Sequence, residues 1–156
     1  MNYQISIETA STSRPLAVVR RRVRPQEFAK VIPEACGIVW NALKAQNIKG
    51  AGRHVTVYLP DGSLEVGVEL ERPIENVAAL GEVVASSLPT GSAAAAVHFG
   101  PYQHLRSAHD AIRDWCSRNG HALAGTHWEI YGHWLDEWNR DPSKIRTDVY
   151  YLLKQP

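Results

Sequence analysis

The sequence predicts an α+β fold made of two similar halves, and three observations predict it. Two segments, residues 26–46 and 103–119, carry apolar side chains at helical spacing. Two shorter segments with strand character precede each of them, and two more follow. The order strand, strand, helix, strand, strand therefore occurs twice in 156 residues. We expect a single domain over residues 1–156, with halves at about 1–72 and 80–156.

The first helical segment has the longer apolar stripe: Phe28, Val31, Ile32, Ala35, Ile38, Val39, Ala42 and Leu43. Because proline fits best near a helix start, we expect the regular helix to begin at Pro33, after a looser turn. In the second segment the stripe is formed by Leu105, Ala108, Ile112, Trp115 and Cys116. Gly120 follows it at the position where a left-handed residue ends many helices.

The rest of the regular structure is expected to be strands, which we place at residues 3–8, 16–22, 54–59, 63–70, 82–87, 93–99, 128–134 and 147–153. Pro60-Asp61-Gly62 is a compact hairpin signal between the third and fourth strands. In the fourth, Val66, Val68 and Leu70 alternate with Gly67 and Glu69, which predicts one buried sheet face.

The repeat is also visible in the residues themselves. Gly52-Arg53-His54, followed by Tyr58, matches Gly125-Thr126-His127, followed by Tyr131, at an offset of 73 residues. Asn47 and Asn119, at the two helix ends, are offset by 72. We interpret this as one internal duplication, and a two-fold scaffold would place the equivalent strands near each other, at a cleft shared by the halves.

Composition excludes several classes of protein. A formal charge of +1 and a pI near 7.9 give no electrostatic reason to bind nucleic acid or a membrane surface. The basic run Arg20-Arg21-Arg22 is expected to be a solvated strand edge. Cys36 and Cys116 fall on apolar helix faces, which favours buried thiols over a disulfide. With no signal peptide and no long apolar run, we expect a soluble cytoplasmic protein.

Glu129 is the most informative residue, because it interrupts the aromatic strand candidate 127–134. Alternation places His127, Glu129, Tyr131 and His133 on one face, with Trp128, Ile130 and Trp134 on the other. Glutamate is a poor strand former, and its charge among apolar rings needs a partner. A site for a flat, apolar and often cationic molecule needs such a carboxylate. The other interpretation is a wet sheet face without function.

The duplication aligns Glu129 with Thr56, so the two halves would bring a carboxylate and a hydroxyl to the shared groove. The candidate rings are Tyr58, Tyr131, Trp40 and Trp128, with core packing as an equal interpretation for Trp40. Trp134 and Trp138 flank a predicted loop over 135–143, where they could cover the groove or cap the sheet.

Metal and cofactor chemistry find little support in the sequence. His127-Trp128-Glu129 imitates the His-x-Glu of zinc deaminases, but the Pro-Cys-x-x-Cys partner is missing. His104 and His109 are five residues apart, which does not place two ligands on one helix face. We therefore predict no metal site and no cofactor.

The second half contains an ordered set of residues: His98-Phe99-Gly100-Pro101-Tyr102, then Leu105 and Trp115, then Trp128-Glu129-Ile130-Tyr131, then Arg146-Thr147-Asp148-Val149-Tyr150. This set resembles the GyrI-like small-molecule-binding family, which also forms the effector-binding domain of some AraC-type and MerR-type regulators. The resemblance is strongest over residues 93–154. It implies two strand-helix-strand-strand modules related by a pseudo-two-fold axis, with an antiparallel sheet curved around a central groove, in which a glutamate of a Glu-x-Tyr strand is the main polar contact. Carried over, this residue is Glu129, with Tyr131 on the same face.

The resemblance leads to three expectations of function. The first is a stand-alone protein that binds apolar, often cationic or polycyclic ligands through Glu129. The second is a hydrolase of cyclopropane-bearing DNA-alkylating natural products, with Glu129 as general base and Tyr131 in a lesser role. The third is an interaction with gyrase or with a regulator. Because the module starts near Met1, we expect no direct nucleic-acid binding, and no membrane partner; the oligomeric state and the natural ligand stay open.

Overall fold

The fold is α+β, as predicted, and it divides into two compact units. The computed structural model describes residues 2–155. We call Met1–Ser11 together with Thr90–Pro156 the Glu129 unit, and Thr12–Pro89 the Thr56 unit. Each unit contains four antiparallel strands and one long helix.

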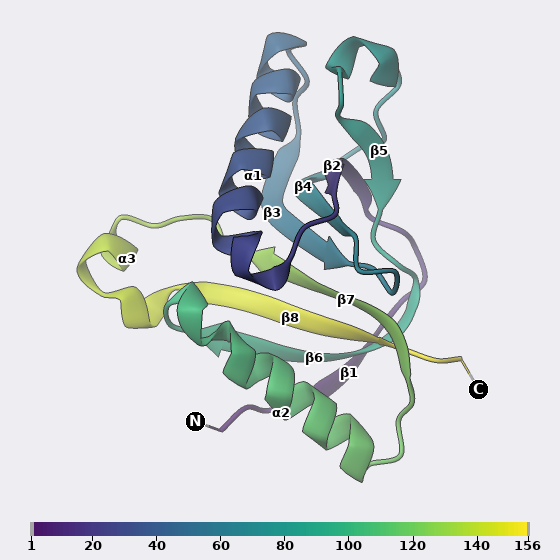
Figure 1. Cartoon of the computed structure of the whole chain (residues 1–156), viewed down its shortest axis with the longest axis vertical. Helices are drawn as coiled ribbons and strands as arrows, with labels where there is room; N and C mark the ends of the chain where they lie inside the picture. Colours follow the sequence, from purple (N-terminus) through teal and green to yellow (C-terminus); the bar gives the residue numbers. More distant parts are fainter. Residues whose placement is uncertain (1, 156) are drawn as a thin grey trace. The chain divides into compact units, whose positions relative to one another are not determined.

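In the Glu129 unit, the strands lie in the order β1-β6-β8-β7. Helix α2 runs along one face of them (Figure 1). The bounds are β1 Ser6–Ala10, β6 Gly91–Phe99, α2 Leu105–Arg118, β7 Leu123–Tyr131 and β8 Arg146–Leu153. Three short helical turns complete the unit: η3 Tyr102–His104, α3 Glu137–Arg140 and η4 Pro142–Lys144.

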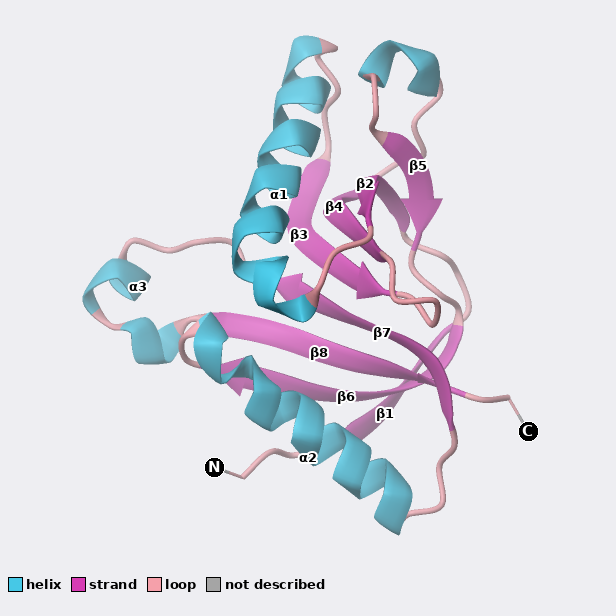
Figure 2. Ribbon diagram, viewed as in Figure 1, coloured by secondary structure: helices cyan, strands magenta, loops and turns pink. Residues whose placement is uncertain are grey.

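In the Thr56 unit, the strand order is β3-β4-β2-β5. Helix α1 lies beside these strands (Figure 2). The bounds are β2 Pro15–Arg21, α1 Phe28–Ala45, β3 Ala51–Tyr58, β4 Leu64–Leu70 and β5 Val84–Ser87, with short turns η1 Pro25–Glu27 and η2 Val77–Leu80. The predicted hairpin is present, since Leu59 N–H donates to the Ser63 carbonyl and Gly62 has a φ of 89°.

The two compact units do not follow the two expected stretches of sequence. β1 pairs with β6, although eighty residues separate them, and β5 pairs with β2. β1 belongs to the first expected stretch, 1–72, but pairs with β6, the strand that precedes α2 in the Glu129 unit. β5 belongs to the second expected stretch, 80–156, but pairs with β2, the strand that precedes α1 in the Thr56 unit.

The two long helices end in the same way, which supports the duplication. Ile48 N–H donates to the Leu43 carbonyl, and His121 N–H donates to the Cys116 carbonyl. Both are the six-to-one hydrogen bond of a Schellman motif, which needs a left-handed residue just before the donor. Those residues are Asn47 (φ 53°) and Gly120 (φ 74°). They are 73 residues apart, the offset of the strand match, whereas the expected Asn119 lies one position earlier.

The prediction that α1 begins at Pro33 was wrong. The helix begins at Phe28, after the 3-10 turn η1, and contains Pro33. Proline at this position removes one backbone donor near the start of the helix. The helix continues through it because Ala35, Val39 and Leu43 are buried against the strands of the unit.

One face of the Glu129 unit is covered by α2. The buried side chains of the helix form a core with every second residue of β6 and β8. From the helix these are Leu105, Ala108, Ile112 and Cys116. These strand residues are Ala94, Ala96, Val149, Tyr151 and Leu153. The register pairs Ala94 with Tyr151 and Ala96 with Val149, so small and large side chains face one another beneath the helix.

Strand β4 is buried on both faces, where one buried face was predicted. The side chains of Glu65 and Glu69 are 8% and 7% exposed and form ion pairs with Arg20 and Arg53. Gly67 lies between them, where an added Cβ would be 1.8 Å from the Ala17 carbonyl oxygen. Close approach of β2 to β4 explains this glycine.

The structure also revises several smaller predictions. β7 ends at Tyr131, so His133 and Trp134 follow the strand, and the predicted loop contains α3. Arg20 and Arg21 lie beyond the part of β2 that β5 covers, and they pair with Glu65 and Glu82. No helix within residues 2–155 is long and apolar enough to cross a membrane.

Candidate functional site

The side chains of β7 divide between two faces of the sheet, as the alternation predicts. His127, Glu129 and Tyr131 are in register with Tyr151, Val149 and Thr147 of β8. Val149 and Tyr151 belong to the core beneath α2, so Glu129 lies on the face that the helix covers. Trp128 and Ile130 lie on the opposite face.

Glu129 is a buried carboxylate in a short hydrogen-bond network. The residue is 5% exposed. His109 Nε2 lies 2.6 Å from Oε2, and the Tyr131 hydroxyl donates to Oε1 at 2.6 Å. Because an ionised carboxylate can only accept, His109 Nε2 carries the proton of the first bond. Hydrogen bonds to a charged group are stronger than neutral ones, which helps to hold this charge away from water.

The network continues through the second nitrogen of His109. Its Nδ1 lies 2.7 Å from the Tyr151 hydroxyl, and Arg113 Nη1 donates to the same hydroxyl at 3.4 Å. Arg113 also pairs with Asp110 at 2.6 Å. Burial raises the pKa of Tyr151 to about 12, partly offset by the charge of Arg113. The phenol therefore stays protonated and can both donate and accept.

Aromatic rings surround the carboxylate. His127 stacks on Tyr151 with centroids 4.5 Å apart and an interplanar angle of 4°. His109 meets both of these rings edge-on at 5.5 Å, and Tyr102 meets Tyr131 edge-on at 5.6 Å. Burial, followed by the charge of His109, lowers the pKa of His127 to about 4. His127 is thus a neutral ring near pH 7, and it adds aromatic surface without adding charge.

His109 is the residue of this network that the sequence analysis does not predict. Its spacing of five residues from His104 argues against a metal site and indicates no other role. Its position relative to Leu105 and Ile112 does place it on the apolar stripe of α2, and it is only 9% exposed. A histidine on a helix face that packs against a strand bearing a glutamate was the signal that could have identified the pair.

The other predicted ligand-binding residues are not all brought to this site. Trp128 is buried on the opposite sheet face, where it stacks on Tyr150 at 5.3 Å. Trp134 is 51% exposed beyond the end of β7, and its Nε1 donates to Asn139. Neither residue shares the face of Glu129 within β7.

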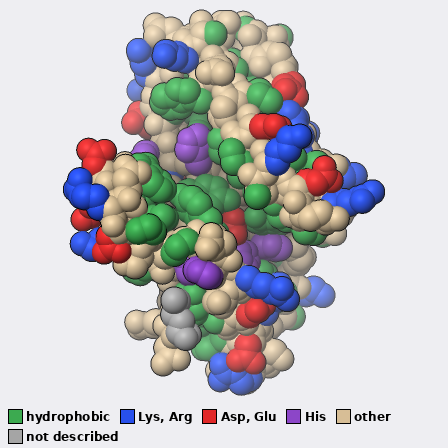
Figure 3. All heavy atoms as spheres, turned by 60° about the vertical axis from the view of Figure 1, so that its left-hand side comes forward, with side chains coloured by type: hydrophobic (Ala, Val, Ile, Leu, Met, Phe, Trp, Pro, Cys, Tyr) green, Lys and Arg blue, Asp and Glu red, His purple; other side chains and the backbone are tan. Residues whose placement is uncertain are grey.

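Three predicted residues belong to the Thr56 unit. Thr56 is fully buried on β3, and Tyr58 contacts the ring of Phe28 at 5.7 Å. Trp40 on α1 is 50% exposed, so the core interpretation of this residue was wrong. Figure 3 shows histidine and hydrophobic side chains among those exposed at the surface.

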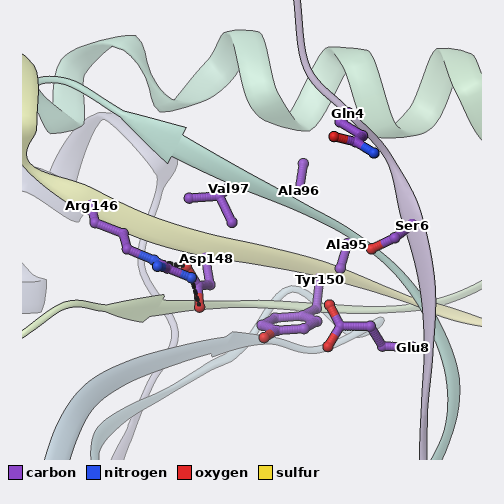
Figure 4. Close-up of a pocket in the computed structure, with 9 residues that line it drawn as sticks. All are labelled: Gln4, Ser6, Glu8, Ala95, Ala96, Val97, Arg146, Asp148 and Tyr150. Carbon is purple, nitrogen blue, oxygen red and sulfur yellow. Dashed lines mark hydrogen bonds and ion pairs between the residues drawn. The ribbon is translucent and has the colours of Figure 1, made fainter.

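A separate hollow lies on the other face of the Glu129 unit (Figure 4). It has a volume of about 170 Å³, and its lining includes Glu8, Val97 and Tyr150 with the ion pair between Arg146 and Asp148. Sites for drug-sized ligands usually have volumes of roughly 300–1,000 Å³. This polar hollow is therefore a poorer candidate than the Glu129 network.

Within residues 2–155, no group of three or more His, Cys, Asp or Glu side chains is placed to hold a metal ion. Both cysteines are free thiols, with Cys116 buried and Cys36 partly buried.

Solved structures of the same fold provide the comparison with known proteins. The C-terminal domain of EcmrR matches over 100% of both chains, with a TM-score of 0.80 and 21% identity. A longer EcmrR chain in a complex with DNA is matched over 58% of its length, with a TM-score of 0.71. This chain therefore spans little more than half the length of that chain.

Two further structures cover almost the whole chain. SAV2435 bound to tetraphenylphosphonium matches over 99% of this chain and 94% of its own, with a TM-score of 0.66 and 13% identity. A hydrolase from Listeria innocua matches over 97% and 92%, with a TM-score of 0.64 and 11% identity. No protein-family model and no curated protein sequence matches the chain. At these identities the comparisons establish the fold alone, and the chain has the α+β fold of these structures, as the sequence predicted.

Proposed function

We propose that this protein binds small apolar cations through the buried carboxylate of Glu129. The single observation that supports this best is the position of the carboxylate, 5% exposed and held by His109 and Tyr131. The rings of His127, Tyr151 and Tyr131 lie around it on the same side of the sheet.

Sheet stability does not explain a glutamate at this position. Removing a carboxylate from water costs several kcal/mol, and its neighbours recover this only with good geometry. An apolar side chain facing α2 would avoid the cost. A cationic ligand would explain the buried negative charge, because it neutralises the carboxylate inside a site of low polarity.

The rings add binding free energy that depends little on the shape of the ligand. A cation over an aromatic face gains roughly 0.5–2 kcal/mol, depending on its desolvation. Tetraphenylphosphonium, to which SAV2435 is bound, combines a positive charge with four phenyl groups. It is therefore the first probe for this protein as well.

The test is isothermal titration calorimetry with tetraphenylphosphonium at pH 7.5. Glu129→Gln preserves the shape of the side chain and removes its charge, and we expect it to weaken binding by about tenfold or more, which corresponds to about 1.4 kcal/mol. Glu65→Gln is the matched control, because Glu65 is also buried but pairs with Arg20 in the Thr56 unit. Equal affinity of wild type and Glu129→Gln, with circular dichroism showing both folded, would contradict the proposal.

A hydrolase is the second candidate, favoured by the structural match to the Listeria innocua hydrolase. Glu129 would act as a general base that delivers a water to a strained electrophilic carbon, and such bases contribute about 10²–10⁴-fold. Both carboxylate oxygens already accept hydrogen bonds of 2.6 Å, so one of these bonds must lengthen before a water is activated.

Mass spectrometry separates binding from hydrolysis. A cyclopropane-bearing alkylating compound is incubated with wild type and with Glu129→Gln. The binding proposal expects intact compound in both samples. A water adduct that forms with wild type and not with the variant would establish the hydrolase instead.

A further inference from the structure

We propose that His109 is the resident counter-cation of Glu129, and that a cationic ligand binds by exchanging with a proton of His109. This inference rests on the proposed function, since it concerns how the same site receives its ligand. It makes His109 a residue that determines specificity: a cation displaces the proton, whereas a neutral molecule of similar shape does not.

The geometry lets His109 gain or lose a proton without losing either of its hydrogen bonds. His109 Nε2 donates to Glu129 in either charge state of the imidazole, at 2.6 Å. Nδ1 accepts from the Tyr151 hydroxyl when His109 is neutral and donates to it when His109 is charged, across the same 2.7 Å. A hydroxyl serves both roles, because it has one proton and two lone pairs. His109 can therefore gain or lose a proton while both of its hydrogen bonds persist.

Direct contact with the Glu129 carboxylate favours a proton on His109 when the site is empty. On α2, Asp110 pairs with Arg113 at 2.6 Å and with Arg106 at 3.8 Å, so this group keeps one net positive charge, which acts against the proton. From β7, Glu129 presents a negative charge in direct contact. From β8 comes the protonated phenol of Tyr151, and from β6 comes His98, whose pKa burial lowers.

His127 does not compete with His109 for this proton. Its ring lies 5.5 Å from His109, and burial keeps the pKa of His127 at about 4. Imidazole is the side chain that changes charge between pH 5 and 8. Because His127 is already neutral near pH 7, the proposal assigns the exchanged proton to His109, whose ring contacts Glu129 directly.

A bound cation reverses this preference. A second positive charge beside the same carboxylate repels an imidazolium, so the complex favours neutral His109 and releases a proton. By linkage, acid must weaken binding of the cation. For one exchanged proton the apparent affinity falls by up to about tenfold for each unit by which the pH is lowered.

The experiment is calorimetry with tetraphenylphosphonium between pH 6 and 8.5, in pairs of buffers with different heats of ionisation. We expect wild type to release up to one proton for each cation bound, and to bind more weakly at lower pH. Triphenylphosphine oxide, a neutral probe, should release none. His109→Gln can still donate to Glu129 and carries no charge, so its affinity should be independent of pH, with no proton release.

His121→Gln is the control, because His121 stacks on Trp115 at 5.2 Å after the end of α2. It should retain the wild-type pH dependence. Should His109→Gln fail to fold, the wild-type measurement decides alone, since binding without proton release overturns the exchange. Binding that is independent of pH refutes this inference and leaves the proposed function intact, whereas no binding at any pH refutes the proposed function.

Discussion

Lowering the pH from 7 to 5 should destabilise this protein through His127. The ring stacks on Tyr151 at 4.5 Å, and burial, followed by the neighbouring His109, lowers the pKa of His127 to about 4. The ordinary value for histidine is about 6.5. The folded protein therefore resists a proton that the unfolded chain accepts. Stability from the neutral ring is present above about pH 6.5 and is lost as the pH falls towards 4.

The magnitude follows from the difference between the two pKa values of His127, about 4 folded and about 6.5 unfolded. Each pH unit between them corresponds to about 1.4 kcal/mol, so the whole difference is worth about 3 kcal/mol. At pH 5 most unfolded chains carry the proton and few folded ones do. We expect His127 to account for about 2 kcal/mol of the loss between pH 7 and 5.

Urea denaturation followed by circular dichroism measures this loss. His127→Gln removes the titrating ring, so the variant should lose about 2 kcal/mol less than wild type between the two pH values. His98 also has a lowered pKa, but it contributes to both proteins and cancels in the difference. The same fall in unfolding free energy for wild type and His127→Gln would refute the assignment.

Two further predictions concern packing. Gly67→Ala should destabilise the protein by more than about 3 kcal/mol or prevent folding, because its Cβ would lie 1.8 Å from the Ala17 carbonyl oxygen. The added Cβ of Gly37→Ala in α1 meets nothing within 4 Å, so this variant should be more stable by up to about 1 kcal/mol. Urea titrations compare the unfolding free energies of the two variants, and equal effects would contradict the close approach of β2 to β4. Burial raises the pKa of Cys36 to about 11, and that of the buried Cys116 is also raised. Ellman's reagent at pH 8 should label Cys36 slowly and Cys116 only in urea; rapid labelling of both thiols in the native protein would show that this core is open.

Much of the fold was predictable, because local patterns determine it. The apolar stripes identify both long helices, and alternation places Glu129 and Tyr131 on one side of β7. The helix ends were predictable to about one residue, since left-handed residues at Asn47 and Gly120 follow from the Schellman geometry.

Strand pairing was less predictable, because it depends on residues far apart in the sequence. β1 pairs with β6 and β5 with β2, yet nothing in the short strand 6–10 specifies its partner. The same limit applies to β4, where the alternation of Val66, Gly67 and Val68 predicts one buried face. The second face is buried because Glu65 and Glu69 have arginine partners on neighbouring strands, and long-range pairs of this kind leave no periodic signal.

The contrast among the buried glutamates strengthens the interpretation of Glu129. Glu65 and Glu69 are neutralised by arginines, whose charge persists at any physiological pH. Glu129 instead contacts a histidine and a phenol, of which only the histidine readily changes charge. An arginine in place of His109 would hold the carboxylate permanently and exclude a cationic ligand. In the proposed exchange, a removable proton on His109 neutralises Glu129 in the empty site and leaves when the ligand supplies the positive charge, which is the property that a reversible cation-binding site requires.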